Sequence, residues 1–429
     1  MRKHFLQAIS ACVLLAVAFA CGGTDPDDPE QQEQQQEETP EEKREKLSTA
    51  FLSAKETVAN MGAGWNLGNT LDSNSGDTTN MWIERWTDRR PSDYETAWGQ
   101  AVATGELMQM MSDAGFRSIR IPVTWYPHMG AKFRFDGNST LWCPSQDPIG
   151  DKADAEWMAR VKTVVDYVLA ADMYCILNIH HDTGTANTHW IVASEESHAL
   201  NGARFKSLWT QIAETFKDYD GRLLFEAFNE MTDEANSWCF ASYGTPSHYD
   251  AAMAASAYAA VNAYAQDFVD AVRATGGNNT NRNLIVNTYA ACSGEGTWNS
   301  HLKDPLKEMK LPSDKVDGHL IFQVHYYPSF SSLTEAKSSV DALIKGLNDN
   351  LAVKGAPVII GEWGVGENSP TNYDHYRTTF LNFAQYLVER AKANGMATFC
   401  WMGVTDGQDR AVPKFTQPDL KDAIVKGAE

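Results

Sequence analysis

The sequence contains few cysteines and no pattern that would use them together. Seven of its 429 residues are cysteine, and no two of these are separated by only two residues. Five follow Cys21, and an odd number at scattered positions excludes both a disulfide framework and a zinc site built on cysteine. Cys175 and Cys400 lie in stretches expected to be strands, and we interpret them as small core residues. A disulfide between Cys143 and Cys239 stays open.

Positive charge and metal-binding motifs are scarce as well. The formal net charge is -20, which argues against nucleic acids and anionic polymers as partners. It neither favours nor excludes a neutral substrate. No H-E-x-x-H motif occurs. His180, His181 and Asp182, followed by His189, could suggest a metal ion, but adjacent histidines on a strand point to opposite sides. We therefore expect no metal ion and no other cofactor, and a monomeric protein.

The N-terminus contains an apolar run that is too short to cross a bilayer. Two basic residues precede this run, which ends at Ala20 directly before Cys21, so residues 1–20 are expected to be a signal peptide. The junction resembles the cleavage site of bacterial lipoproteins, although Ala18 stands where Leu is usual. This resemblance implies that Cys21 becomes a lipidated N-terminus. A plain signal peptidase site is the alternative.

The segment after Cys21 has no apolar residues that could form a core. Residues 22–42 contain nine Asp or Glu and no Lys or Arg, so residues 21–46 are expected to be a flexible acidic tether. Removing these nine negative charges and the two positive charges of the signal peptide leaves -20 + 9 - 2 = -13 for the rest. Such a stretch resembles the export signal of surface lipoproteins in Bacteroidetes-like bacteria. We expect an outer-membrane lipoprotein that faces the cell surface, with a periplasmic or secreted protein as alternatives.

Two apolar stretches in the remaining chain each end in a carboxylate. The stretch that begins at Arg222 ends in Asn229 and Glu230, and the stretch that begins at Pro357 leads to Glu362. Runs of this length and composition are typical of strands that are buried on both faces of a parallel sheet. A carboxylate where such a strand emerges needs a partner or a chemical task.

Residues 47–429 alternate between strand and helix patterns without a second linker. Eight such alternations predict one catalytic domain with an α/β fold, a (β/α)8 TIM barrel, whose extra length lies in loops. The expected strands are 62–67, 118–121, 174–180, 223–228, 283–288, 320–325, 357–361 and 397–401. The expected helices are 104–114, 153–171, 203–219, 251–275, 334–348 and 373–394, with a weaker one near 301–309.

Long loops follow the first four expected strands, at the end of the barrel where such enzymes keep their active sites. Tryptophan is abundant in these loops, and its flat ring with a polar edge suits the face of a sugar. We expect about half of these rings to pack against the barrel and the others to line a groove. The residues are Trp82, Trp86, Trp98, Trp125, Trp142, Trp190 and Trp238.

Polar residues at the ends of other expected strands should meet on the same face. Together, two carboxylates, an arginine, an amide and aromatic rings indicate glycoside hydrolysis through a covalent intermediate. The chain also resembles glycoside hydrolase family 5, the cellulase family of the 4/7 superfamily, over residues 60–402. The matching motifs are Gly64-Trp65-Asn66-Leu67-Gly68-Asn69-Thr70-Leu71, Ile119-Arg120-Ile121-Pro122, Leu177-Asn178-Ile179-His180-His181-Asp182, Phe228-Asn229-Glu230, His325-Tyr326-Tyr327 and Ile360-Gly361-Glu362-Trp363-Gly364.

The resemblance implies a role for each matching residue. Glu230 would be the acid/base and Glu362 the nucleophile, with Arg120 and Tyr327 holding Glu362 as a carboxylate. Asn229 would bind the sugar 2-hydroxyl. The remaining residues implied to bind substrate or support the site are His180, His325, Trp401, Trp65, Asn66 and His181, and the roles of His181 and of Asp182 stay open.

The resemblance places the chain nearest the endoglucanase branch, so the expected activity is that of a retaining endo-β-1,4-glucanase. A xyloglucan-specific or mixed-linkage β-glucanase is the alternative, because the sequence does not show whether the groove admits branched glucose. An endo-β-mannanase and a non-catalytic surface glycan-binding protein are more remote. Loss of either Glu230 or Glu362 would be expected in the latter, and both are present.

Overall fold

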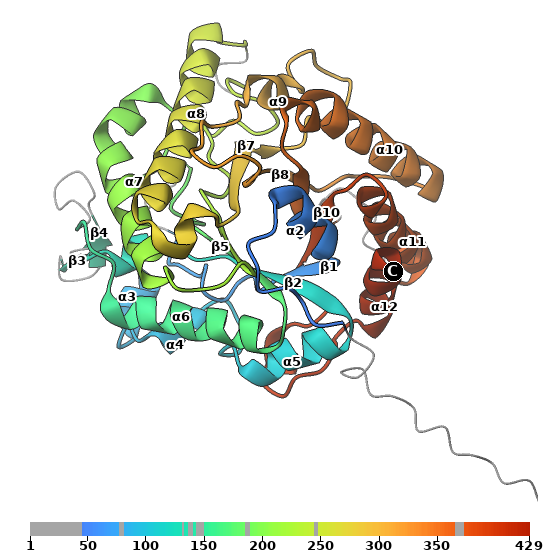
Figure 1. Cartoon of the computed structure of the whole chain (residues 1–429), viewed down its shortest axis with the longest axis horizontal. Coiled ribbons are helices and arrows are strands. Elements are labelled where there is room, and N and C mark those ends of the chain that lie inside the picture. The colour runs from blue at the N-terminus through green and yellow to red at the C-terminus, as the bar shows by residue number, and fades with distance from the viewer. Residues whose placement is uncertain are drawn as a thin grey trace, which may run out of the picture. The chain divides into compact units, whose positions relative to one another are not determined.

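Eight parallel strands close into a barrel in the computed structural model of the chain (Figure 1). The structure describes residues 45–76, 81–130, 133–135, 140–142, 150–184, 189–243, 248–364 and 373–429, which belong to one unit, Arg44–Glu429. The predicted (β/α)8 fold is confirmed. Around the barrel the strands are β1 (Ala63–Asn66), β2 (Phe116–Ile121), β5 (Tyr174–Asn178), β6 (Leu223–Glu226), β7 (Leu284–Cys292), β8 (Leu320–Tyr326), β9 (Val358–Trp363) and β10 (Ala397–Trp401).

Helices surround this barrel (Figure 1). They are α5 (Gly105–Asp113), α6 (Ala155–Ala170), α7 (Glu195–Thr215), α8 (Ala251–Ala274), α9 (Asp304–Glu308), α10 (Leu333–Asn350), α11 (Tyr373–Lys392) and α12 (Pro418–Ala428). Helix α7 begins eight residues before the predicted start because Ser194 caps it, its side chain accepting a hydrogen bond from the backbone N–H of Ser197. Helix α12 was not predicted.

Shorter elements occupy the loops and one end of the barrel. Helices α3 (Trp82–Trp86) and α4 (Pro91–Glu95) follow β1, and β3 (Phe133–Phe135) pairs with β4 (Thr140–Trp142) after β2. Helix α2 (Ala54–Asn60) covers the end of the barrel where the strands begin, and it packs on the apolar residues that fill that end. The loops that follow the strands lie at the opposite end, where the strands stop.

The barrel interior changes from apolar to polar along the strands. Ile176, Leu224, Ile285 and Ile321 belong to the apolar cluster that α2 covers. Because alternate residues share a face of a strand, the next inward positions lie two residues later. These positions hold four buried polar side chains, Asn178, Glu226, Asn287 and Gln323.

Three strands are shorter than the sequence predicted, β1 by one residue at each end and β5 and β6 by two residues at their ends. Strand β5 ends at Asn178 and β6 at Glu226, so His180 and Glu230 follow the strands in the loops. The interpretation of β6 as almost wholly apolar is wrong in one position, because Glu226 is a fully buried carboxylate within the strand. Strand β7 extends beyond its predicted end, with Ala290 and Ala291 at positive φ.

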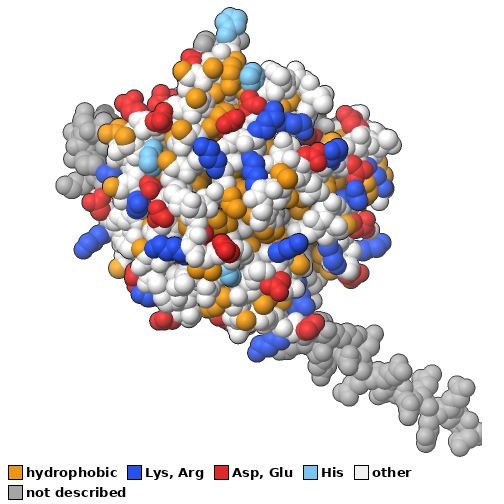
Figure 2. All heavy atoms as spheres, turned by 45° about the horizontal axis from the view of Figure 1, so that its top comes forward, with side chains coloured by type: hydrophobic (Ala, Val, Ile, Leu, Met, Phe, Trp, Pro, Cys, Tyr) orange, Lys and Arg blue, Asp and Glu red, His pale blue; other side chains and the backbone are white. Residues whose placement is uncertain are grey.

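Figure 2 shows acidic and basic side chains interspersed on one face of the molecule, without a block of one sign. Among the described residues, no helix combines the length and the apolar character needed to cross a membrane. Cys175 and Cys400 are buried, as expected of core residues. Cys239 is a free thiol, whereas Cys143 lies outside the described residues, so the proposed pairing of these two has no support.

Helix α7 provides a matched test of the core. Leu208 is fully buried against the barrel, whereas Leu200, two turns away on the same helix, is 73% exposed. We expect Leu208→Ala to lower the free energy of unfolding by about 2–5 kcal/mol, because it leaves a cavity. Leu200→Ala should change it by no more than about 0.5 kcal/mol. Urea denaturation measures both, and equal effects would contradict the assigned packing.

Candidate active site

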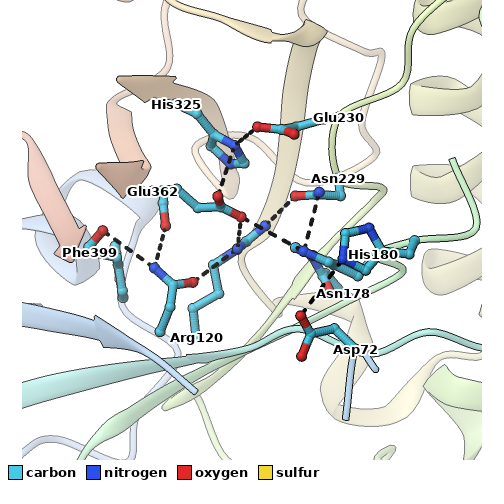
Figure 3. Close-up of polar contacts among 12 residues, drawn as sticks. Asp72, Arg120, Asn178, His180, Asn229, Glu230, His325, Glu362 and Phe399 are labelled. Atoms are coloured by element: carbon cyan, nitrogen blue, oxygen red, sulfur yellow. Dashed lines mark hydrogen bonds and ion pairs between the residues drawn. The ribbon is translucent and has the colours of Figure 1, made fainter. Parts of the chain in front are cut away.

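The two predicted carboxylates meet at the end of the barrel where the strands stop, with an imidazole between them (Figure 3). Nδ1 of His325, in β8, lies 2.7 Å from Oε1 of Glu230 and 3.5 Å from Oε2 of Glu362. One ligand atom from each of these three side chains lies within 4.8 Å of the other two. Carboxyl pairs that work through a covalent glycosyl intermediate are about 5–5.5 Å apart, against about 6.5–9.5 Å for pairs that place a water directly. The close approach of one oxygen from each carboxyl is in line with the covalent route.

Glu362 is anchored on both of its oxygens. Arg120 Nη1 donates to Oε1 at 2.7 Å, and the hydroxyl of Tyr327 donates to Oε2 at 2.8 Å. Burial raises the pKa of Glu362, while the charge of Arg120 and the Tyr327 hydrogen bond act in the opposite direction. Of the two carboxyls, Glu362 is the one that has a guanidinium and a hydroxyl to hold it ionised.

Glu230 has a different environment. Its side chain is 24% exposed, and burial raises its pKa from 4.5 to about 7 although the charge of Arg120 opposes this. Burial also lowers the pKa of His325 to about 4, so its imidazole is neutral near pH 7. If the Gln323 amide donates to Nε2 of His325, 3.4 Å away, then Nδ1 carries the hydrogen and donates to Oε1 of Glu230. Oε2 of Glu230 is then the oxygen that can carry an acidic proton.

Asn229 and His180 lie beside the carboxylates (Figure 3). Oδ1 of Asn229 accepts a hydrogen bond from Arg120 Nη2 at 2.8 Å, and its Nδ2 lies 3.4 Å from Nε2 of His180. The His180 ring is parallel to the ring of Trp401, with the centroids 5.7 Å apart. These groups provide hydrogen bonds and a flat apolar surface next to the carboxylates, which is what recognition of a sugar ring requires.

His181 occupies the edge of this surface. Its side chain is 31% exposed, its Nε2 lies 3.8 Å from Oδ2 of buried Asp72, and its ring centroid lies 5.5 Å from that of Trp98. Asp182 has a structural role that the sequence left open. Its carboxylate accepts hydrogen bonds from the backbone N–H groups of Trp125 and Tyr126, and so ties the loop after β2 to the loop after β5.

Two predicted residues support the site without lining it. Asn66 is fully buried, its Nδ2 donating to the backbone carbonyl of Gly361 and its Oδ1 accepting from Arg120. Trp65 is also fully buried and its indole N–H donates to the carbonyl of Met402. Asn66 therefore has the supporting role that was one of the two expected, whereas Trp65 points to the opposite face of β1, because neighbouring β-strand residues point alternately into and out of a packed barrel.

Two sets of described side chains bring three ligand atoms close enough for a metal ion, namely Asp72, His180 and His181, and Glu230, His325 and Glu362. The argument that adjacent histidines must point apart does not apply here, because both follow the end of β5, and their ring centroids are 4.5 Å apart. Both sets consist of groups that already have a place in the site described above.

The tryptophans of the long loops differ in exposure, and the lining of a groove by the exposed ones stays a prediction. Trp125 and Trp190 are buried, whereas Trp86 and Trp238 are 71% and 45% exposed. The side chain of Trp142 lies outside the described residues. An aromatic patch on the loops after β6 and β7 was not foreseen, since its tryptophan, on the second loop, was not among the candidates. It consists of Phe240, Tyr243, Tyr249 and Trp298, and Phe240 is its centre.

Sequence reasoning missed four buried polar residues around the site. These are Asp72, Asn287, Gln323 and Glu226, of which Glu226 pairs with Arg120 through both oxygens. A signal was available for Glu226, because a charge in the middle of a doubly buried strand requires a partner.

Comparison with known proteins places this geometry in a family context. Residues 79–406 match the family model described as cellulase, glycosyl hydrolase family 5. The chain is 32% identical to Endoglucanase A of Clostridium longisporum over 406 residues, which cover 89% of this chain and 67% of that protein. It is 30% identical to Endoglucanase B of Neocallimastix patriciarum over 394 residues, covering 88% and 72%.

Solved structures resemble the chain over a similar length. A GH5-4 broad specificity endoglucanase from an uncultured bacterium is 47% identical, with a TM-score of 0.79, covering 89% of this chain and 97% of that one. A variant of PbGH5A, a glycoside hydrolase family 5 enzyme from Prevotella bryantii B14 solved with a xyloglucan tetradecasaccharide, is 37% identical. Its TM-score is 0.73, with 88% and 99% coverage.

The raised pKa of Glu230 predicts a pH-dependent effect on stability. The folded state prefers the neutral carboxyl of Glu230. The contribution of this group to the free energy of unfolding is therefore fully present below pH 4.5 and is lost as the pH rises through about 7. Glu230→Gln cannot ionise, so we expect its melting temperature to exceed that of the wild type at pH 8 by more than at pH 5. Glu234→Gln, at an exposed position in the same loop, should show no such difference. Calorimetry at both pH values tests this, and equal differences at both would contradict the assignment.

Proposed function

The chain belongs to glycosyl hydrolase family 5, the cellulase family, and from this premise we propose that it is a retaining endo-β-1,4-glucanase. The observation that carries the proposal is the approach of Glu230 and Glu362 to within 4.8 Å, with only one of them held by a guanidinium. That asymmetry separates an acid from a nucleophile.

In the first step the carboxylate of Glu362 attacks the anomeric carbon while Glu230 gives its proton to the departing glycosidic oxygen. Asn229, whose orientation is set by Arg120, is placed to bind the 2-hydroxyl of the reacting sugar, a contact that strengthens as positive charge develops on the ring. The product of this step is an ester between the sugar and Glu362.

The ester changes the electrostatics of the site. Glu362 no longer carries a negative charge, so the repulsion that it shares with Glu230 is gone and the pKa of Glu230 falls. Glu230 can then take a proton from water, which attacks the same face of the anomeric carbon that the leaving group occupied. Two inversions give net retention of configuration.

The aromatic patch supports action on a polymer. It begins on the loop after β6, which also carries Glu230, the residue that protonates the leaving group in this proposal. Two of its rings, Tyr243 and Trp298, are 42% and 59% exposed. Stacking on rings of this kind would hold the chain beyond the cleaved bond. Undecorated β-1,4-glucan is the proposed substrate. Xyloglucan is the alternative, which the xyloglucan complex of the 37% identical relative favours.

The proposed activity predicts a defined response to two substitutions. Glu362→Ala and Glu230→Gln should each lower turnover at least about a hundredfold, because one removes the nucleophile and the other the acid. Initial rates on carboxymethylcellulose, mixed-linkage β-glucan, xyloglucan and glucomannan measure this, with Glu234→Gln as the control. Proton NMR of the first products should show the β-anomer. Turnover that survives Glu362→Ala, or an α-anomer as first product, would overturn the mechanism.

We further propose that the enzyme works as a monomeric lipoprotein on the outer face of the outer membrane. The signal peptide of residues 1–20, Cys21 and the acidic tether of residues 21–46 support this. Residues 47–429 would then form the catalytic domain. An anchored enzyme would release oligosaccharides next to the cell that takes them up.

Lipidation of Cys21 can be tested directly. In a Gram-negative host given a labelled fatty acid, the wild type should take up label and fractionate with membranes. Cys21→Ser should take up none. Cys175→Ser, at a buried core cysteine, is the control and should stay labelled. Equal labelling of the wild type and Cys21→Ser would exclude the anchor, and protection from added protease in intact cells would place the enzyme inside the outer membrane.

A further inference from the structure

Arg120 uses every hydrogen that its guanidinium can donate. Nε donates to Oε2 of Glu226 at 2.6 Å, and Nη2 donates to Oε1 of Glu226 at 2.8 Å and to Asn229 at 2.8 Å. Nη1 donates to Asn66 at 2.9 Å and to Glu362 at 2.7 Å. Five N–H groups therefore make five hydrogen bonds, and two of the five go to Glu226 in the paired geometry that fixes the guanidinium plane.

Glu226 is itself held on several sides. Besides Arg120, the side-chain amides of Asn178 and Asn287 each donate to its Oε1 at 3.2 Å. It is fully buried below the site, so it cannot touch a substrate. Although burial alone would raise it, the charge and hydrogen bonds of Arg120 leave the pKa of Glu226 below its ordinary value. Glu226 is thus a permanent negative charge under the reacting groups.

We propose that Glu226 is a positioning residue of the proposed glycosidase reaction, which orients Arg120 toward Glu362 and Asn229 and balances its positive charge. This inference rests on the proposed function. Without Glu226, the guanidinium would lose the bonds that fix its plane, and the hydrogen bonds to the nucleophile and to Asn229 would become variable. Sub-ångström placement of such groups is what catalysis depends on.

The charge balance has a second consequence. With Glu230 and His325 neutral, the buried charges are Arg120, Glu226 and Glu362, a total of one negative charge that faces the positive sugar ring of the transition state. Removing the charge of Glu226 leaves this set neutral, and the developing positive charge is then less well stabilised.

The negative charge of Glu226 also affects the pKa of Glu230, the proposed acid. Burial is the main cause of the raised pKa of Glu230, and the negative charge of Glu226 adds to it. The titratable and charged groups that face Glu230 and Glu226 come from every neighbouring strand or the loop after it. They are Arg120, His180, Cys292, His325, Tyr327 and Glu362.

A matched pair of variants separates this role from simple stabilisation. Glu95 makes the same two-oxygen pairing with Arg160, at 2.6 and 2.9 Å, but between α4 and α6 outside the barrel. Glu226→Gln and Glu95→Gln therefore remove chemically equivalent charges from buried pairs. Both should lower the melting temperature, and only Glu226→Gln should change the reaction.

For Glu226→Gln we expect kcat to fall roughly 10- to 100-fold, the range for residues that orient a catalytic group through another group. KM should change little, because Glu226 does not touch substrate. The alkaline limb of kcat/KM, which reports Glu230, should move to lower pH, since a negative charge that raises its pKa has been removed. Glu226→Asp keeps the negative charge, so the alkaline side of its kcat/KM profile should stay at the wild-type pH even though its kcat is lower.

The outcomes are distinguishable. If the wild type cuts none of the four polysaccharides, the proposed function fails. If the wild type is active and Glu226→Gln retains its rate and pH limb, as Glu95→Gln should, then Glu226 only stabilises the fold and the inference is wrong. If Glu226→Gln does not fold, Glu226→Asp provides the test. The positioning role would be overturned if Glu226→Asp kept the wild-type kcat, whether or not the alkaline side of its kcat/KM profile had shifted.

Discussion

Arg120 carries a positive charge into the middle of a barrel from which water is excluded, and the arrangement of the site follows from how that charge is paired. A buried ion costs several kcal/mol unless other charges and hydrogen bonds compensate for it. Glu226 and Glu362 provide the charges, and Asn66 and Asn229 provide the remaining acceptors. Two of the residues that satisfy Arg120, Glu362 and Asn229, are therefore also residues that contact the reacting sugar in the proposed mechanism, while Glu226 and Asn66 hold the guanidinium from below.

This constraint explains why the two carboxyls to which we assign the catalysis differ. Both are in low-dielectric surroundings, which favour the neutral acid. Glu362 receives a guanidinium and a tyrosine hydroxyl, whereas Glu230 receives a neutral imidazole and remains near pKa 7. The barrel creates the difference by geometry, since Arg120 at the end of β2 reaches across the interior to β6 and β9 while Glu230 stands in a loop above it.

Much of the fold and of the site could be predicted because both depend on patterns that are local in sequence. Eight apolar stretches separated by amphipathic ones specify a barrel, and a barrel brings all strand ends to one face. This placed Glu230, Glu362, His180 and His325 together correctly. The failures have a different origin. Trp65 was taken as a site residue because it lies in a motif that matches the family, but alternation along a strand directs its side chain and that of Asn66 to opposite faces.

The sequence by itself determined the secondary-structure order, the strand-end carboxylates and the family, because these follow from the spacing of residue types along one chain. Only the tertiary structure decided how burial raises the pKa of Glu230, that Glu226 pairs with Arg120 across 106 positions, and that aromatic rings from two loops form one patch. The physical reason is that pKa values and pairings of buried charges depend on distances between side chains remote in sequence. Those distances exist only once the barrel has closed.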